Sequence, residues 1–189
     1  DLSGKTILLT GGTGSFGNAF ISRIIDEWPD AVVRVYSRDE LKQSEVRAKF
    51  GDRQVRYLIG DVRDRSRMAR AAQGCDIVVH AAAMKQVPTA EYNPFECIRT
   101  NVFGAENLVY AALRRNVKRV IALSTDKAAA PINLYGRQKV ESERLVHAAA
   151  REFAVTLRAP LLMGNSLAGK RSTHERLLAD WAAGRPAKL

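Results

Sequence analysis

The sequence has few cysteines, few aromatic residues and no long run of apolar residues. Its 189 residues include two cysteines, too few for a disulfide framework, so both thiols are predicted to be reduced, as in a cytoplasmic protein. No apolar stretch approaches the ~18 residues needed to cross a bilayer, and the polar start does not resemble a signal peptide. The cysteines, histidines and acidic residues show no spacing typical of a metal site. We therefore expect a cytoplasmic protein with no membrane segment and no bound metal.

Positive charge is in excess: 30 lysines and arginines against 20 acidic residues give a formal net charge of +10. This charge suits either a solvated surface or an anionic ligand such as a nucleotide. The basic residues are scattered and no aromatic-rich motif accompanies them, so nucleic-acid binding is not predicted. With 46% hydrophobic residues, the chain can bury the core of a folded domain.

Short apolar runs alternate with helical patterns over the first 160 residues. The runs are nearly continuous, as in strands buried on both faces, so we predict an α/β fold of the Rossmann type: a doubly wound parallel sheet flanked by helices. The predicted strands are 6–9, 32–36, 55–59, 77–80, 119–123 and 155–157. One predicted helix follows the glycines, after residue 17. The other predicted helices cover 39–50, 63–73, 101–115 and 134–153.

A glycine-rich loop joins the first predicted strand to the first helix. Gly11, Gly14 and Gly17 would provide a sharp turn, a close backbone approach to a pyrophosphate, and close packing of helix on strand. The helix N-terminus would offer free N–H groups and the positive end of its dipole to phosphate. An ordinary turn is the alternative, but this context favours NAD(P) binding. The predicted loop contacts are Gly11, Thr13, Gly14, Ser15, Phe16 and Gly17.

The end of the second predicted strand bears on the choice of cofactor. NAD enzymes often carry an acidic residue there, whereas this chain has Ser37 and Arg38. A guanidinium can pair with a 2′-phosphate, so NADP is favoured over NAD. Asp61 would accept a hydrogen bond from the adenine amino group, or cap the next turn. The other predicted cofactor contacts are Val62, Ala81, Ala82, Ala83, Lys85, Asn101, Tyr135 and Lys139.

Tyr135 and Lys139 form a YxxxK pair on one face of a predicted helix. An ammonium there would lower the pKa of the phenol from about 10, so that Tyr135 could take a proton from a substrate hydroxyl during hydride transfer. Ser124 and Thr125 end the strand before this helix. Together with the glycine loop, this combination resembles the extended, nucleotide-sugar type of short-chain dehydrogenase/reductase.

Seven further segments narrow the resemblance. They are 36–40 (YSRDE), 60–64 (GDVRD), 80–88 (HAAAMKQVP), 91–94 (EYNP), 100–107 (TNVFGAEN), 124–128 (STDKA) and 131–136 (PINLYG). Together they resemble the inverting UDP-N-acetylglucosamine 4,6-dehydratases (5-epimerases), and membrane-anchored polysaccharide-biosynthesis relatives share parts of the pattern. The resemblance implies a UDP-N-acetylglucosamine-like substrate.

The resemblance also implies roles for residues 125–127. After oxidation of the sugar at C4, Lys127 would remove the C5 proton and Asp126 would protonate the departing 6-hydroxyl, while Thr125 holds O4. Hydride then returns to C6, and reprotonation from the opposite face inverts C5. A base at Lys127 must be neutral, so burial or nearby cations must lower its pKa. The alternative is a surface turn with an Asp126–Lys127 ion pair.

Other residues have less specific predictions. By resemblance, Lys85, Thr125 and Asn133 bind substrate. Asn101 would support the site through a backbone or water contact, or cap the long helix. His80, ending an apolar strand, is expected to be a hydrogen-bonded core histidine. The helices that start near residues 101 and 134 pair between subunits in the superfamily, so a homo-oligomer is expected.

The pattern weakens from Pro160 onward. The dehydratases continue into a longer substrate-binding half, whereas residues 158–165 (RAPLLMGN) look more like nucleotide-sugar reductases. We therefore expect a Rossmann domain over 1–160 and a truncated or minimal substrate region over 161–189, with a helix near 173–183. A fragment, a chimera and a natural minimal form all remain open. So do three functions: an NADP-dependent dehydratase, an NADP-dependent reductase or 4-epimerase, and a non-catalytic cofactor-binding fragment.

Overall fold

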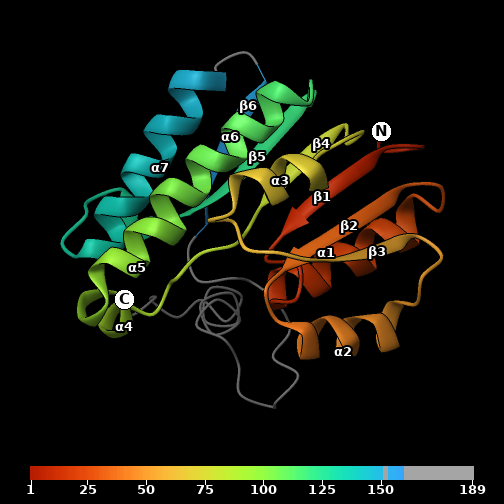
Figure 1. Cartoon of the computed structure of the whole chain (residues 1–189), viewed down its shortest axis with the longest axis horizontal. Coiled ribbons are helices and arrows are strands. Elements are labelled where there is room, and N and C mark those ends of the chain that lie inside the picture. The colour runs from red at the N-terminus through yellow and green to blue at the C-terminus, as the bar shows by residue number, and fades with distance from the viewer. Residues whose placement is uncertain (151–152, 160–189) are drawn as a thin grey trace, which may run out of the picture. The chain divides into compact units, whose positions relative to one another are not determined.

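Six strands form one sheet in the order β3-β2-β1-β4-β5-β6 (Figure 1). The computed structural model describes residues 1–150 and 153–159. β1 pairs in parallel with β2 and β4, β2 pairs in parallel with β3, and β4 with β5. The strands are β1 (Thr6–Thr10), β2 (Val32–Ser37), β3 (Val55–Ile59), β4 (Ile77–His80), β5 (Arg119–Thr125) and β6 (Ala154–Ala159). This is the predicted Rossmann-type sheet, and the direction of winding reverses between β1 and β4.

Helices follow most of the strands. They are α1 (Ser15–Glu27), α2 (Glu40–Phe50), α3 (Arg65–Ala71), α4 (Val87–Tyr92), α5 (Pro94–Ile98), α6 (Gly104–Arg114) and α7 (Leu134–Ala150). A π-helical turn, η1 (Arg99–Phe103), leads directly into α6, and a 3-10 turn, η2 (Asp126–Ala128), follows β5. In the part of the chain that the structure describes, no helix is both long and apolar enough to span a membrane.

Two hydrophobic clusters cover the two faces of the sheet. Strand side chains alternate between them because successive residues of a strand point to opposite faces. One cluster joins Leu8 and Val78 to Met68, Leu108 and Val146 of α3, α6 and α7. The other joins Leu9, Val33 and Val35 to Ile21 and Val46 of α1 and α2. Both faces are therefore covered by helices, as the continuous apolar runs predict.

The region between β4 and α6 differs from the prediction. No helix was expected over 87–98, yet α4 and α5 lie there. The helix expected from residue 101 is preceded by η1, so Asn101 lies inside continuous helix, and the prediction that it caps the long helix is wrong. The helix expected near 173–183 and the segment 161–189 lie outside the described residues.

Candidate functional site

The glycine loop fits closely against the chain that leaves β4. Gly11 has φ +69°, and a Cβ atom there would lie 2.8 Å from the backbone nitrogen of Ala82. A Cβ at Gly17 would collide with the carbonyl of Gly12, so α1 can approach the loop only without a side chain there. At Gly14 a Cβ would meet only the Gly11 oxygen, at 3.4 Å, and no side chain caps the α1 N-terminus. The loop therefore presents unshielded N–H groups, which suit phosphate.

A cleft of about 310 Å³ opens beside this loop, at the carboxyl ends of β1, β2, β3 and β4. This is the topological switch point at which α/β sheets bind ligands. The predicted cofactor residues that line it are Gly11, Thr13, Gly14, Ser37, Arg38, Asp61, Val62, Ala81, Ala82, Ala83 and Lys85. The remaining ones, Ser15, Phe16, Gly17, Asn101, Tyr135 and Lys139, do not line it.

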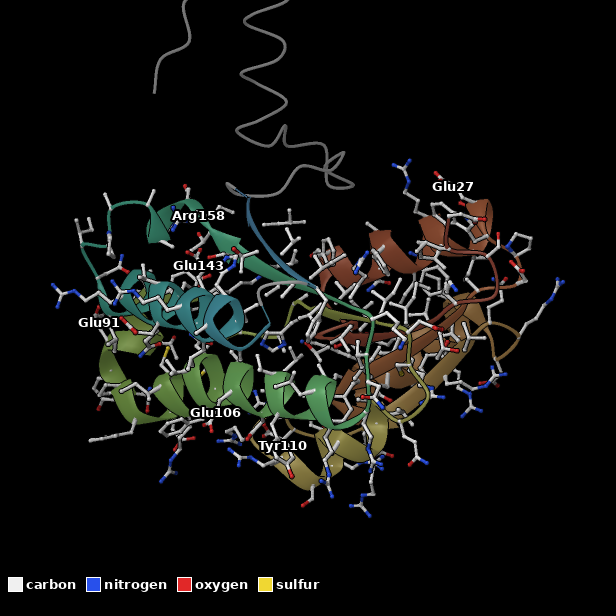
Figure 2. The ribbon with its side chains drawn as sticks, turned by 90° about the horizontal axis from the view of Figure 1, so that it is seen from above. Glu27, Glu91, Glu106, Tyr110, Glu143 and Arg158 are labelled. Carbon is white, nitrogen blue, oxygen red and sulfur yellow. The ribbon has the colours of Figure 1, made fainter. Side chains whose placement is uncertain are left out.

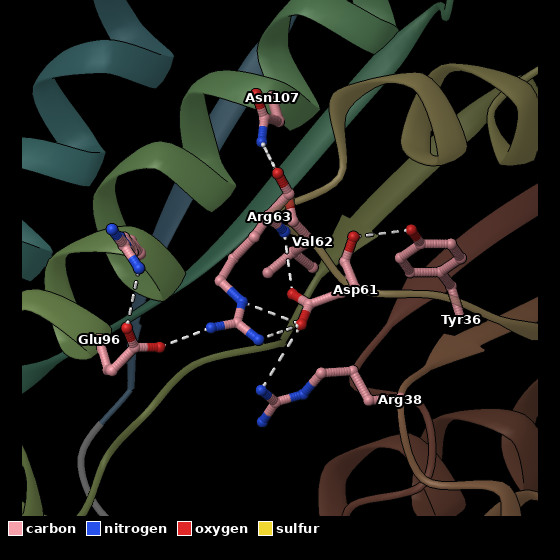
Figure 3. Close-up of polar contacts among 8 residues, drawn as sticks. Tyr36, Arg38, Asp61, Val62, Arg63, Glu96 and Asn107 are labelled. Carbon is pink, nitrogen blue, oxygen red and sulfur yellow. Dashed lines mark hydrogen bonds and ion pairs between the residues drawn. The ribbon is translucent and has the colours of Figure 1, made fainter.

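Asp61 lies between two guanidinium groups at one side of the cleft (Figure 3). Its Oδ2 atom is 2.7 Å from Nη2 of Arg63 and 3.6 Å from Nη1 of Arg38, and its Oδ1 accepts from the Arg63 backbone N–H. Burial acts to raise the pKa of Asp61, but the hydrogen bonds from Arg63 and the charge of Arg38 outweigh it and lower the pKa. Asp61 thus caps the following turn, as one of its two predictions states, while its carboxylate faces the cleft.

The backbone beside Asp61 is tied to three elements. Tyr36 donates its hydroxyl proton to the Asp61 carbonyl at 2.8 Å, and Asn107 of α6 donates to the carbonyls of Val62 and Arg63, each at 3.0 Å. Arg63 also pairs with Glu96 of α5 at 2.6 Å (Figure 3). These contacts hold the loop after β3 at the rim of the cleft.

Thr100 is a cleft residue that the sequence analysis missed. It lies in η1, is 5% exposed and lines the cleft. Its hydroxyl is buried and has no hydrogen-bond partner among the described residues. A ligand group or an ordered water would satisfy this buried, unpaired hydroxyl. The only sequence signal was its place in segment 100–107, one of those that carry the family resemblance, and this does not show where the side chain points.

The residues predicted to be catalytic gather where β5 ends. Thr125 donates to Oδ1 of Asp126 at 2.8 Å, and Lys127 Nζ lies 3.6 Å from the same oxygen. The hydrogen bond from Thr125, together with Lys127, lowers the pKa of Asp126. The Lys127 side chain is 42% exposed. The expectation of burial or a cationic neighbour at Lys127 is therefore wrong for this structure, in which its partner is a carboxylate.

Tyr135 and Lys139 lie on one face of α7, as predicted, but their electrostatics differ from the prediction. Tyr135 is 8% exposed; burial raises its pKa, Thr125 acts to lower it, and Asp126 raises it further. Lys139 Nζ donates to the Leu123 carbonyl at 2.6 Å. The expected lowering of the phenol pKa by the lysine is thus not found: burial raises that pKa, and Lys139 is not among the groups that shift it in the free protein. Burial also lowers the pKa of Lys139 to about 8.

His80 is a core residue, as expected. It is 3% exposed, and its Nδ1 lies 2.7 Å from the Thr10 hydroxyl, which accepts from the Ala82 N–H. Burial and the charge of Lys139 lower the pKa of His80 to about 3, so the ring is neutral. His80 therefore stabilises the turn that leaves β4. That turn, residues 81–83, forms one wall of the cleft.

Asn101 and Asn133 both bond to backbone. Asn101 is 2% exposed; its Oδ1 accepts from the Met84 N–H at 2.9 Å and its Nδ2 donates to the Met84 carbonyl at 3.0 Å. It thus supports the segment that carries Lys85 through a backbone contact, one of its predicted roles. Asn133 accepts from the Gly136 N–H at 2.8 Å and so stabilises the start of α7. Among residues 1–150 and 153–159, no group of three or more His, Cys, Asp and Glu could hold a metal ion.

Sequence comparison identifies a family and curated relatives. The family described as "Polysaccharide biosynthesis protein" matches residues 7–172. A UDP-N-acetylglucosamine 4,6-dehydratase (inverting) from Campylobacter jejuni is 52% identical over 147 residues. A UDP-glucose 4-epimerase from Rickettsia canadensis is 47% identical over 152 residues. Each alignment covers 78% of this chain and 44% of the relative, so the chain spans less than half the length of these proteins.

Solved structures share the fold. Pen from Bacillus thuringiensis is 38% identical, with a TM-score of 0.79 over 90% of this chain and 53% of that one. A UDP-glucose 4-epimerase from Bifidobacterium longum, solved in complex with NAD⁺ and UDP, is 26% identical. Its TM-score is 0.69 over 81% of this chain and 52% of that one.

Proposed function

The chain belongs to the polysaccharide biosynthesis protein family, and from this membership we propose that it is the cofactor-binding and catalytic part of an NADP-dependent nucleotide-sugar 4,6-dehydratase. The observation that carries the proposal is the cluster at the end of β5, where Asp126 and Lys127 lie beside Thr125 and next to Tyr135. The 52% identity to an inverting UDP-N-acetylglucosamine dehydratase supports this choice. Both the UDP-N-acetylglucosamine-like substrate and inversion at C5 are part of the proposal.

The residues of the cleft fit a dinucleotide. Gly14 leaves room for a pyrophosphate at the α1 N-terminus, the Asp61 carboxylate can accept from an adenine amino group, and the buried Thr100 hydroxyl offers a further contact. Ser37 ends β2 and Arg38 follows it; both suit the 2′-phosphate of NADP, although Arg38 pairs with Asp61 and must give up part of that pairing. The epimerase from Bifidobacterium longum, which holds NAD⁺, supports a nicotinamide cofactor. When bound, the dinucleotide would supply a hydride acceptor for C4 and a hydride donor for C6 of the sugar.

Tyr135 and Thr125 would act at the sugar hydroxyl on C4. Tyr135 takes the O4 proton, and Thr125 holds O4 through its hydroxyl. Because burial raises the pKa of the free phenol, Tyr135 needs a positive charge nearby to work near neutral pH. Lys139, buried one turn further along α7, is the residue placed to supply it.

Asp126 and Lys127 would act as a pair in the loss of water. Dehydration needs a protonated acid at O6 and a neutral base at C5, so a proton must move from Lys127 to Asp126, 3.6 Å away. This transfer leaves the total charge of the pair unchanged. A bound sugar would exclude water from these half-exposed side chains, and exclusion of water favours the neutral pair over the ion pair. The exposed ion pair of the free protein is therefore compatible with acid and base roles in the complex.

A 4-epimerase is the second candidate, favoured by the relative from Rickettsia canadensis at 47% identity. Epimerisation changes C4 alone and leaves the C5–H bond intact, whereas dehydration breaks that bond. The test is a proton NMR time course of the 189-residue chain in D₂O with NADP⁺ and UDP-N-acetylglucosamine. A new 6-methyl signal with deuterium at C5 supports the dehydratase. A C4 epimer without deuterium supports the epimerase, and cofactor binding without turnover supports a non-catalytic fragment.

Two variants sharpen this experiment. In Lys127→Met, the 6-methyl product and the C5 deuterium should be lost while NADP⁺ binding is kept, since Lys127 does not line the cleft. Lys118→Met removes an exposed lysine just before β5, at the strand end opposite Thr125, and should behave like the parent chain. Equal losses in both variants would contradict the assignment of Lys127 as the C5 base.

We also propose that the protein is a cytoplasmic homo-oligomer that pairs through α6 and α7. Phe103, Tyr110 and Leu113 are between 42 and 51% exposed on η1 and α6, and a row of exposed apolar side chains is the kind of surface through which subunits pair. Light scattering coupled to size-exclusion chromatography tests this. Phe103→Glu combined with Leu113→Glu should shift an oligomer to monomer.

A further inference from the structure

A row of charged side chains extends from Tyr135 along α7 to β6. Lys139 and Glu143 follow Tyr135 at intervals of four residues, which puts the three side chains on one face of α7. Lys139 is 6% exposed and Glu143 is 7% exposed. Arg158 reaches over from β6, and its Nε and Nη2 donate to the two carboxylate oxygens of Glu143 at 2.9 and 2.6 Å (Figure 2). From Tyr135 the row therefore consists of the cation Lys139, the anion Glu143 and a second cation, Arg158.

Lys139 has a carboxylate neighbour but no carboxylate hydrogen-bonded to it among the described residues. Its Nζ donates to the uncharged Leu123 carbonyl of β5 at 2.6 Å. The charged or titratable groups that face it are Glu143, from the next turn of α7, and His80, from β4, which is neutral. Burial lowers the pKa of Lys139, and Glu143 acts in the opposite direction. Glu143, buried one helical turn from Lys139, is therefore the anion placed to favour the protonated ammonium.

Glu143 in turn is held by a group on another element. Burial acts to raise its pKa, but the hydrogen bonds from Arg158 and the charge of Lys139 outweigh it and lower the pKa. Arg158 bonds to both carboxylate oxygens, so Glu143 is ionised and fixed in place. The same two bonds keep the carboxylate directed at β6 and compensate part of its charge. Around Tyr135 itself the facing groups are Thr125, Asp126 of η2 and Cys97 of α5.

We propose that Glu143 and Arg158 are positioning residues that together set the charge of Lys139: Glu143 holds the proton on the buried ammonium, and Arg158 limits that pull. The inference rests on the proposed function, in which Lys139 supplies the positive charge that Tyr135 needs. Neither residue touches the cleft. Both act through Lys139 and so determine the pH range in which the pair of Tyr135 and Lys139 works.

A purely structural role makes a different prediction. If the Glu143–Arg158 pair only fastened α7 to β6, removal of either partner would loosen the same contact and move every property in the same direction. If the pair sets the charge of Lys139, removing the anion and removing the cation must move the titration of Lys139 in opposite directions. The sign of two shifts therefore separates the two roles.

The experiment follows the Cε resonance of Lys139 by NMR in the 189-residue chain labelled with ¹³Cε-lysine, between pH 6 and 10. Lys139→Arg assigns the signal. In Glu143→Gln the titration midpoint should fall by about one pH unit, and in Arg158→Met it should rise by about half a unit, less because Arg158 is half exposed. Arg158→Lys, which keeps the charge, should restore most of the parent midpoint.

Glu141→Gln is the matched control. It removes a carboxylate of the same helix that pairs with Arg144 at 2.8 Å on the exposed side, so the midpoint should move by less than about 0.2 unit. Circular dichroism at each pH confirms that the variants are folded. Opposite shifts in Glu143→Gln and Arg158→Met support the proposal. Shifts in the same direction, or none, in folded variants overturn it.

The titration is independent of catalysis, so a failure of the proposed function would be recognised separately. NADP⁺ affinity is measured across the same pH range in the same variants. Affinity profiles that follow the Lys139 midpoints are the expected result. A different outcome is that the Lys139 midpoints shift in opposite directions but NADP⁺ affinity and turnover do not change with them. That outcome would support the effect of Glu143 and Arg158 on the charge of Lys139, and it would overturn the inference that this charge sets the pH range of Tyr135 and Lys139.

Discussion

Replacing Thr100 by valine should make the free protein more stable and its cofactor complex weaker. The Thr100 hydroxyl is buried and has no partner among the described residues, and such a group costs about 1–3 kcal/mol. Valine has nearly the same shape and no hydroxyl. Because the hydroxyl is uncharged, we expect the low end of this range: a gain of about 1 kcal/mol in the free energy of unfolding.

Once NADP⁺ is present, the substitution should reduce the stabilisation that the bound cofactor gives. If the hydroxyl meets the cofactor, its loss removes a hydrogen bond worth about 1.4 kcal/mol and raises the Kd roughly tenfold. At an NADP⁺ concentration of about 100 times the parent Kd, binding stabilises the parent chain by about 2.7 kcal/mol. It should stabilise Thr100→Val by only about 1.4 kcal/mol.

Urea unfolding with and without NADP⁺, followed by tryptophan fluorescence, measures both quantities in one experiment. Thr89→Val, at an exposed position of α4, is the matched control and should leave both values unchanged. A Thr100→Val chain that is less stable than the parent, and that gains as much from NADP⁺, would refute the reasoning. It would mean that the hydroxyl is already paired in the free protein and does not face the cofactor.

Three further predictions concern the loop, the cleft and the core. Gly17→Ala should lower the free energy of unfolding by about 2–3 kcal/mol in urea melts, because its Cβ collides with the Gly12 carbonyl, whereas Gly14→Ala should keep stability and weaken NADP⁺ binding in calorimetry. Above pH 4, Asp61→Asn should be less stable than the parent, because a carboxyl whose pKa is lowered in the folded state stabilises the protein only while it is ionised. This difference in stability should vanish as the pH falls further, and a difference that persists at pH 2 would contradict the reasoning. His80 should contribute a loss of about 1.4 kcal/mol per pH unit as the pH falls below 6.5 toward 3, because the unfolded chain binds a proton at His80 that the folded chain does not. His80→Leu should therefore show a slope shallower by that amount, and equal slopes would contradict the assignment.

The elements that the sequence predicted well are those whose signal is local. Every predicted strand is present, because strands buried on both faces must be continuously apolar. The glycine loop was equally readable, since Gly11 must adopt a positive φ and Gly17 must lack a side chain. The contact of Asn101 with backbone was one of two readings that residue type alone left open.

The elements that were missed depend on distant contacts. α4 and α5 are too short, at six and five residues, to show a helical period, and Pro88 and Pro94 at their starts look like loop signals. They are held in place by packing, as the burial of Ala90 and Cys97 beside Tyr135 shows. Thr100 was missed for the same reason, because burial of its hydroxyl at the cleft follows from where η1 lies.

The sequence by itself determined the α/β class, the glycine loop and the identity of the side chains that reach the ends of β1 to β5, because these follow from period, residue type and spacing along one segment. Only the tertiary structure decided the charges of the site. Tyr135 and Lys139 were predicted to act on each other through their spacing alone, yet their pKa values depend mainly on burial, and that of Lys139 also on Glu143, which Arg158 of β6 holds. Burial and counter-charges are contributed by several elements at once, and no single stretch of sequence contains their sum.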